Sequence, residues 1–381
     1  MANEAEWDEL LDVARRGGLS RREFVRRALA LGIGSRLVLG LTGCRVSDRG
    51  TDRPANEPDA PPLGPIEKEL HIYNWAEYIP EEAVPEFERE FGVKVTYDTY
   101  ETNEEMLLNL RAGVRGYDLV VPTGWQVQYM TTLGLLRPLS RQQVSNWGNL
   151  SPMFLRPPAN PDGRYAAPYL WGITGIAYRH DKVAGPVESW ATFHDRRYAG
   201  RMTMVNERRE VIGAMLRYRG HSLNSTDHAE LAQAQADAIA AKRNLKAYLS
   251  VQAGPHLVSG EVWVAQLYNG DARRLSRQEP AVRFAVPGEG CTIYCDFMCI
   301  PRSAPNPRAA HEFINYMLRP DTGARLAEFA GYGTPNLAAQ KLLQDPVSYP
   351  SEEEHRRLEY QVDLGAANAV WDRVWEEIRN A

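Results

Sequence analysis

The sequence predicts an α/β protein with two lobes. Its 381 residues are enough for about two domains at roughly 150 residues each. Between residues 70 and 122 the periodicity changes from strand to helix to strand to helix to strand, which is typical of βαβ units. Strand-like and helical segments continue after residue 165. We therefore expect a second α/β lobe and a ligand site between the two, a common place for small-molecule sites.

The elements of the first part follow from local pattern. Leu70, Ile72 and Asn74 alternate with His71, Tyr73 and Trp75 in a strand, and apolar residues at helical spacing predict a helix over 80–91. A second strand is expected at 93–97 and a second helix at 102–112, capped by Thr102 or Asn103. The short apolar run 118–122 is typical of a buried parallel strand.

The later part predicts further strands and helices. Residues 165–178 look extended, and Ser225, Thr226 and Asp227 cap an Ala-rich helix that we expect to reach about residue 248. Further strands are expected at 262–267, 283–286 and 292–300, and helices at 308–318, 321–330 and 365–379.

The N-terminal segment has the pattern of an export signal. Arg21 and Arg22 precede an apolar run, residues 28–43, that only Arg36 interrupts, and the run ends in small residues before Cys44. We predict a twin-arginine lipoprotein signal over 1–43, with Cys44 acylated. The alternative is a soluble N-terminal helix with a buried cysteine. Residues 44–66 are rich in proline and lack an apolar period, which predicts a disordered tether.

Composition excludes some classes. The formal net charge of −5 argues against a nucleic-acid-binding protein, which would carry a basic patch. The eight histidines are scattered, and no nucleophile elbow, zinc motif, dinucleotide-binding motif or phosphate loop is present, so we expect no enzyme, metal site or cofactor. Cys291, Cys295 and Cys299 fit buried apolar side chains best. A disulfide between Cys291 and Cys295 stays open if a turn separates them.

A set of segments spread over residues 69–381 resembles the bacterial extracytoplasmic polyamine-binding proteins, the spermidine/putrescine-binding subunits of ABC importers. The order and spacing of the segments carry the resemblance: Tyr73-Asn74-Trp75-Ala76-Glu77-Tyr78-Ile79-Pro80, Tyr100-Glu101-Thr102-Asn103-Glu104, Tyr117-Asp118-Leu119-Val120-Val121-Pro122, Pro168-Tyr169-Leu170-Trp171-Gly172, Arg209-Glu210-Val211, Leu318-Arg319-Pro320-Asp321 and Gly331-Tyr332-Gly333-Thr334-Pro335-Asn336.

The resemblance implies a two-lobed periplasmic-binding-protein fold of the flytrap type (type II), with several crossings between the lobes. It implies one lobe from 69–173 with 297–345 and another from 178–295 with 350–381. It also implies a monomer that captures putrescine or spermidine outside the cytoplasm and delivers it to an ABC permease, held at the membrane through Cys44. Closure of the lobes would enclose the ligand.

The resemblance also implies the site. A polyamine needs aromatic walls for its methylenes and carboxylates for its ammonium groups. The positions that match the family's site are Trp75, Tyr78, Thr123, Trp125, Glu207, Glu210, Tyr268, Asp271, Tyr294, Asp296, Tyr332 and Gln361. Asp296 would bind a terminal amine, Glu207 and Glu210 would share one face of a helix start, and Tyr332 would form a wall.

Some residues depart from the family's pattern. Ala76 replaces a hydroxyl residue, Trp125 replaces a tyrosine and Glu207 is longer than the usual aspartate, while Asp271 resembles the putrescine branch. The preferred polyamine therefore stays open.

Structural alternatives also stay open. The aromatic residues could be core residues, the two glutamates could complement a helix N-terminus, and Asp271 could be a turn residue after Asn269-Gly270. Arg208 and Arg209 fit a solvated face. Other functions that stay open are a polyamine sensor, a receptor for another cation and an amine-processing enzyme.

Overall fold

The computed structural model describes residues 64–112, 116–158, 160–250, 252–344 and 350–381. The chain divides into two compact units, residues 1–56 and residues 57–381, and all described residues belong to the second. The predicted signal segment 1–43, the predicted lipidation site Cys44 and the predicted tether as far as residue 63 lie outside the described residues.

A mixed sheet runs through the described body. Its strands are β1 Glu69–Trp75, β2 Lys94–Tyr100, β3 Leu119–Val120, β4 Ala166–Arg179, β5 Met202–Met204, β6 Leu245–Tyr248, β7 Val264–Tyr268, β8 Val282–Ala285, β9 Thr292–Cys299 and β10 Glu359–Tyr360. The order along the sheet is β2-β1-β3-β9-β4-β7-β5-β6, with β10 paired to β9 and β8 paired to β4. The pairs β1–β2, β1–β3, β5–β6, β5–β7 and β9–β10 are parallel, and the others are antiparallel.

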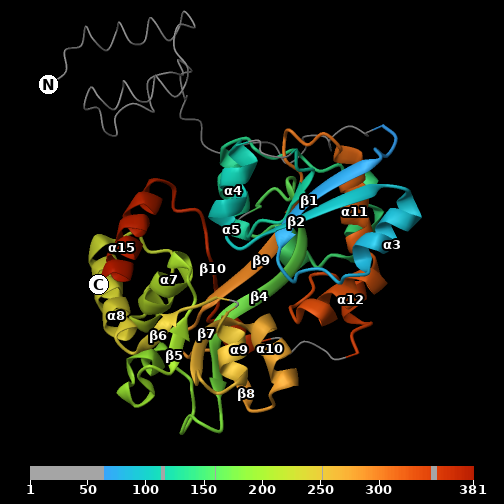
Figure 1. Cartoon of the computed structure of the whole chain (residues 1–381). Coiled ribbons are helices and arrows are strands. Elements are labelled where there is room, and N and C mark those ends of the chain that lie inside the picture. Colours follow the sequence, from blue (N-terminus) through green and yellow to red (C-terminus); the bar gives the residue numbers. More distant parts are fainter. Residues whose placement is uncertain (1–63, 113–115, 159, 251, 345–349) are drawn as a thin grey trace, which may run out of the picture. The chain divides into compact units, whose positions relative to one another are not determined.

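Two long strands join the two halves of this sheet. Residues 166–173 of β4 pair with β9, whereas residues 174–179 pair with β7 and β8. Figure 1 shows β4 and β9 side by side between a group with β1 and β2 and a group with β5, β6 and β7. Nearly every residue of both strands is buried, as expected where a sheet is covered on both faces.

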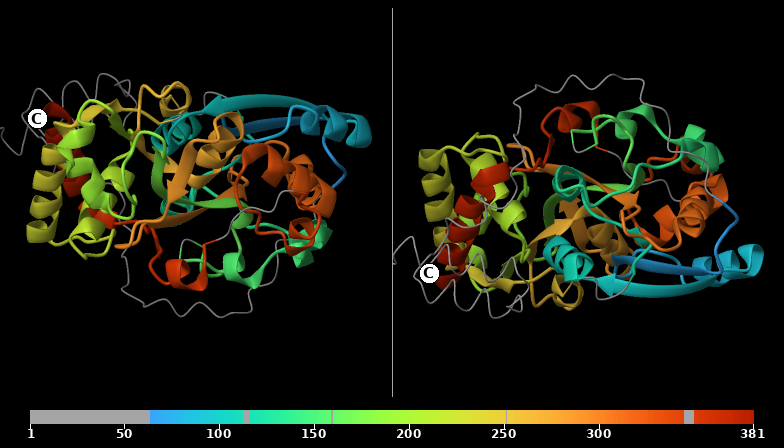
Figure 2. Two further views of the ribbon diagram at one scale, coloured as in Figure 1. Left: turned by 90° about the horizontal axis from the view of Figure 1, so that it is seen from below. Right: turned by 90° about the horizontal axis from the view of Figure 1, so that it is seen from above.

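Helices cover both halves. They are α3 Ala83–Phe91, α4 Asn103–Ala112, α5 Gly124–Thr132, α6 Pro152–Leu155, α7 Arg208–Tyr218, α8 His228–Lys242, α9 Ala253–Val258, α10 Asn269–Gln278, α11 Pro307–Met317, α12 Pro320–Ala330, α13 Leu337–Gln340, α14 Glu352–His355 and α15 Asn368–Asn380. Short 3-10 turns occupy Arg141–Gln143, Ser145–Asn149, Trp190–His194, Arg196–Tyr198 and Gly365–Ala367. In both views of Figure 2, α8 and α15 lie at one end of the described body and α3 at the other.

The predicted helices and strands are present in the structure, with one clear error. The Ala-rich helix begins where predicted, because the Asp227 carboxylate accepts from the backbone N–H groups of Ala229 and Glu230. It ends at Lys242, however, and residues 245–248 form β6 instead of a continued helix. β6 pairs with β5 in parallel, so a contact between distant segments overrides the local helical pattern.

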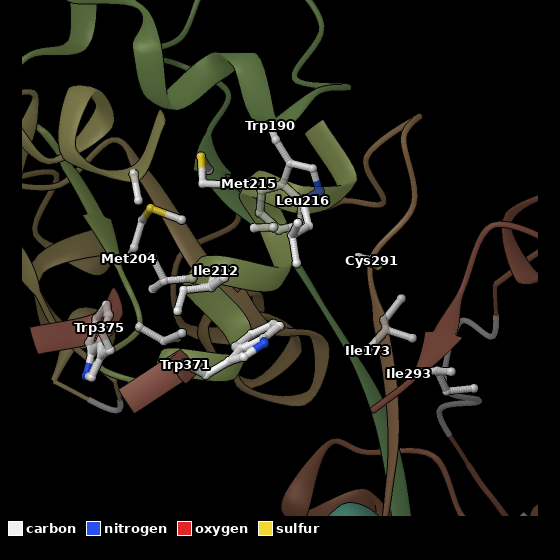
Figure 3. Close-up of a cluster of buried hydrophobic side chains, with 14 of the residues drawn as sticks. Ile173, Trp190, Met204, Ile212, Met215, Leu216, Cys291, Ile293, Trp371 and Trp375 are labelled. Atoms are coloured by element: carbon white, nitrogen blue, oxygen red, sulfur yellow. The ribbon is translucent and has the colours of Figure 1, made fainter. Parts of the chain in front are cut away.

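The hydrophobic core beside β5, β6 and β7 is built around α7. Residues 209–216 of this helix are all buried, as expected for a helix enclosed on every side. Figure 3 shows Trp190 and Trp371 beside Ile212, Met215 and Leu216 of this helix. Trp190 and Trp371 are 1% and 0% exposed, and removing such a side chain typically costs about 3–5 kcal/mol of stability.

The three cysteines of β9 and its approach are buried and unpaired. Cys291, Cys295 and Cys299 carry free thiols, as the buried apolar interpretation predicts. Burial raises the pKa of each thiol above its usual range. Within the described residues, no helix is both long enough and apolar enough to cross a membrane.

Candidate binding site

The first part of the candidate site forms where β1 ends. Tyr78 follows this strand, and its hydroxyl donates to Oδ2 of Asp296 on β9 at 2.6 Å. Both residues are buried, with 7% and 4% of their surface exposed. The two lie 218 positions apart in the sequence, so only the fold brings them together.

Asp296 is a buried carboxylate with spare acceptor capacity. Among the described residues its Oδ1 atom has no hydrogen-bond partner, although the atom is buried. Burial raises the pKa of Asp296 to about 6, while Tyr78 and Thr123 act in the opposite direction. A cation beside Oδ1 would lower this pKa again, because an opposite charge favours the ionised form.

Thr123 lies beside Asp296, and Trp75 is fixed at the end of β1. Thr123 forms an isolated bridge with Asp296, and Asn103 of α4 both donates to the Thr123 hydroxyl and accepts from its backbone N–H, each at 3.2 Å. The Trp75 indole N–H donates to the Val121 carbonyl at 2.8 Å. The polar atom of the indole is therefore already paired, and its ring face is the part that can contact a ligand.

Four tyrosine rings form a continuous row. The ring centroids of Tyr78 and Tyr332 are 5.5 Å apart, those of Tyr332 and Tyr294 are 6.3 Å apart, and those of Tyr294 and Tyr268 are 5.5 Å apart. All three contacts are edge-on, the geometry that aromatic pairs prefer. The rings come from the loop after β1, from the residues after α12, from β9 and from the end of β7.

Two glycines leave room for this row. Gly172 of β4 lies opposite Tyr294 of β9, and a Cβ atom there would lie 2.6 Å from the Tyr294 hydroxyl oxygen. A Cβ atom on Gly270 would lie 2.3 Å from the Tyr332 ring. Both positions therefore require the absence of a side chain.

The second acidic group lies at the start of α7. Glu207 is the residue before the helix, and Glu210 lies in its first turn, as predicted. Thr292 and Gln361 donate to the Glu210 carboxylate at 3.0 and 2.9 Å. Burial raises the pKa of Glu210, although Thr292, Gln361 and the Arg209 charge partly offset this.

Glu207, which is half-buried, also has a raised pKa. Burial raises it to about 8, and the negative charges of Glu104 and Glu210 act in the same direction. Gln266 of β7, two residues before Tyr268, donates to the Glu210 backbone carbonyl at 3.0 Å, which joins the start of α7 to that end of the tyrosine row. The negative charges of both glutamates also raise the pKa of Tyr268.

Asp271 has a partner that the sequence reasoning missed. It lies in the first turn of α10, so the alternative interpretation as a turn residue is wrong. Arg274, one helical turn later, donates to its carboxylate at 2.7 Å and to the Ala330 carbonyl at 2.7 Å. Arg274 also lies 3.4 Å from the carboxylate of Glu77. The i,i+3 spacing on a helix was the signal available for this pair.

The solvated-face interpretation is wrong for Arg209, which is 2% exposed. Its guanidinium lies 4.8 Å from the Trp371 ring and donates to the Val362 carbonyl and to Asn224 Oδ1. Trp125 is buried in the first turn of α5, and within the described part of the chain no hydrogen bond or ring contact joins it to the other predicted residues. No group of three or more His, Cys, Asp or Glu residues suited to a metal ion occurs among the described residues.

Comparison with known proteins identifies the family. The chain belongs to the bacterial extracellular solute-binding proteins, whose family model matches residues 82–354. It is similar to the spermidine/putrescine-binding periplasmic protein of Escherichia coli K12, with 33% identity over 365 residues that cover 94% of this chain and 99% of that protein.

Solved structures agree with this assignment. A putative spermidine/putrescine ABC transporter protein from Listeria monocytogenes has a TM-score of 0.79 and 31% identity, covering 82% of this chain and 99% of that chain. The Tp0655 (TpPotD) lipoprotein of Treponema pallidum has a TM-score of 0.76 and 30% identity, covering 82% of this chain and 100% of that chain. These likenesses confirm the predicted α/β fold of the two-lobed binding proteins.

Proposed function

We propose that this chain captures a polyamine, putrescine or spermidine, outside the cytoplasm and delivers it to an ABC permease for uptake. The Escherichia coli relative is named as a spermidine/putrescine-binding protein, and the Listeria monocytogenes structure is titled a putative spermidine/putrescine ABC transporter. The observation that carries the proposal for this chain is a row of four tyrosines with carboxylates toward each end. Buried Asp296 lies beside Tyr78, and half-buried Glu207 and buried Glu210 lie at the start of α7, where Gln266 of β7, two residues before Tyr268, donates to the Glu210 carbonyl.

The arrangement suits an alkyl chain with an ammonium group at each end. The tyrosine rings offer apolar surface to the methylenes, and a ring face contributes about 0.5–2 kcal/mol to binding a cation. Each ammonium needs a carboxylate, because an unpaired buried charge costs several kcal/mol. Asp296 Oδ1 supplies one acceptor, and the glutamates of α7 supply the other.

The proposed mechanism is closure of two lobes, 69–173 with 297–345 and 178–295 with 350–381. Gln128 of α5 accepts from the Asp363 backbone N–H at 3.0 Å, and Arg274 of α10 reaches the Ala330 carbonyl. Each contact joins residues assigned to different lobes. Such contacts stabilise a closed form around the ligand, since residues from both lobes supply the site.

We further propose that the chain is a monomeric lipoprotein, exported by the twin-arginine route and anchored through acylated Cys44. The relative from Treponema pallidum is itself described as a lipoprotein. Mass spectrometry of the native N-terminus tests this proposal. An acylated Cys44 supports it, and an uncut chain that begins at Met1 contradicts it.

Isothermal titration calorimetry with putrescine, cadaverine, spermidine and spermine tests the function. We expect at least one to bind with a micromolar Kd or tighter, about −8 kcal/mol. Absence of binding heat with all four, in a protein that melts cooperatively, would contradict the polyamine proposal. The ligand should be recovered unchanged after release, since the proposed role is transport and not catalysis.

A further inference from the structure

Gln361 lies in the segment that follows β10. The side chains that hold this segment in place, Arg209 and Asn224, come from a distant part of the sequence. Gln361 is 7% exposed and donates to Glu210 Oε1 at 2.9 Å, with Thr292 Oγ1 at 3.5 Å. Only two residues, Glu359 and Tyr360, pair with β9 before it. So short a strand cannot by itself hold a side chain in one position.

Arg209 contacts the backbone one residue beyond Gln361. Its Nη1 atom donates to the Val362 carbonyl at 2.9 Å, and its Nη2 atom donates to Asn224 Oδ1 at 2.6 Å. The guanidinium lies over the Trp371 ring at 4.8 Å. An arginine that is 2% exposed and bonded in this way has little conformational freedom.

Asn224 holds the same segment through three further hydrogen bonds. Its Oδ1 atom also accepts from the Val362 backbone N–H at 3.0 Å, and its amide donates to the Tyr360 carbonyl at 2.8 Å and to Glu359 Oε1 at 3.0 Å. Arg209 and Asn224 therefore hold the backbone on both sides of Gln361. Arg209 is also the sequence neighbour of Glu210, the residue that Gln361 contacts.

We infer that Arg209 and Asn224 are positioning residues that preassemble the Gln361–Glu210 pair at the second acidic end of the site. Neither residue is assigned a contact with the ligand. They act by keeping the Gln361 amide on the Glu210 carboxylate, so that binding does not have to order this segment. The expected effect of these residues on polyamine affinity rests on the proposed function. Their expected effect on the order of residues 359–362 does not. Fixing a binding group in advance reduces the entropy lost on binding.

The test compares Arg209→Met with Arg219→Met. Both arginines belong to the α7 region, donate to side-chain oxygens and lie over an aromatic ring, but Arg219 pairs with Asp237 and Tyr218, away from residues 359–362. We expect Arg209→Met to weaken polyamine binding about tenfold and Arg219→Met to change it by less than about twofold. Asn224→Ala should resemble Arg209→Met, and Arg209→Lys should recover part of the affinity.

A double-mutant cycle separates positioning from general destabilisation. In a Gln361→Ala background, Arg209→Met should cost little further affinity, because the side chain that it positions is gone. An equal loss in both backgrounds, or an unchanged affinity in folded Arg209→Met protein, would overturn the inference.

Hydrogen–deuterium exchange over residues 356–365 provides the readout that does not need a ligand. The Val362 amide should exchange faster in Arg209→Met and Asn224→Ala than in the original chain or Arg219→Met. If no polyamine binds but this difference is found, the proposed function fails and the anchoring stands. If exchange is unchanged, the anchoring fails whatever the chain binds.

Discussion

Replacing Asp296 with asparagine should stabilise the ligand-free protein while weakening polyamine binding. Asparagine has nearly the same shape as aspartate, and its Oδ1 atom can still accept the hydrogen bond that the Tyr78 hydroxyl now donates at 2.6 Å. The substitution therefore changes the charge of the carboxylate more than the packing around it.

The magnitude follows from the pKa. Burial raises the pKa of Asp296 from 3.8 to about 6. A shift of about 2 units corresponds to about 3 kcal/mol at 1.36 kcal/mol per unit. Because the raised value means that the fold favours the neutral form, this penalty is absent below pH 4, grows between pH 4 and 6, and is complete above pH 6. The new amide group lacks a partner at the Oδ1 position, which costs about 1–3 kcal/mol, so we expect a net gain of at most about 2 kcal/mol at pH 7.5.

Thermal unfolding without ligand, measured from pH 4 to pH 8, is the assay. Asp296→Asn should melt up to about 3 °C above the original chain at pH 7.5 and near the same temperature at pH 4. Polyamine binding at pH 7.5 should weaken by about 30-fold or more, since a buried ammonium loses its charged partner.

The matched control is Asp118→Asn. Asp118 is also buried with a raised pKa, but each of its two oxygens accepts from N–H groups, namely the His71 and Asn306 backbone amides and the Asn306 side-chain amide. The NH2 group of an asparagine would therefore face an N–H donor in either orientation. This control should lower the melting temperature and leave affinity nearly unchanged. An Asp296→Asn protein that is less stable than the original chain at pH 7.5, or that binds polyamine equally well, would refute the reasoning.

Three further predictions concern the rest of the site. Burial raises the pKa of Glu207 to about 8, so polyamine binding at pH 7 should release up to about one proton, measured by calorimetry in buffers of different ionisation enthalpy. Glu207→Gln should abolish most of that release, and an unchanged release would count against the assignment. Gly172→Ala would place a Cβ atom 2.6 Å from both the Tyr294 hydroxyl and Asn269 Oδ1 and should cost about 1–3 kcal/mol of stability as well as affinity. Gly148→Ala, with nothing within 4 Å, is its control in the same melting and binding assays. Arg274→Met should destabilise the protein by about 1–2 kcal/mol, because it removes the positively charged partner of the Asp271 carboxylate. Glu77→Gln should have a much smaller effect on the melting temperature, since Glu77 is 66% exposed, and equal effects would contradict the assigned pairing.

The local pattern of the sequence was sufficient to predict the positions of most strands and helices. Alternating apolar residues located β1, and the polar residues before α8 located its start, because both signals depend on near neighbours. The end of α8 was missed, since β6 depends on its partner β5, about 40 residues earlier in the chain.

The contacts within the site could not be predicted from local sequence pattern. The resemblance named both Tyr78 and Asp296, but their hydrogen bond depends on packing between positions 218 residues apart. Arg209 was predicted to be a surface charge because its aromatic partner, Trp371, lies far from it in the sequence, near the C-terminus. Arg274 could have been found from its spacing to Asp271, but no local signal indicated its bond to the Ala330 carbonyl.

A crystal structure of the protein with its preferred polyamine tests the central claim most directly. The account predicts one terminal nitrogen within hydrogen-bonding distance of Asp296 Oδ1, about 2.7–3.0 Å away, and the other beside the carboxylates of Glu207 and Glu210. The methylenes should lie along the row of rings formed by Tyr78, Tyr332, Tyr294 and Tyr268. A bound polyamine with neither end on these carboxylates would contradict the account.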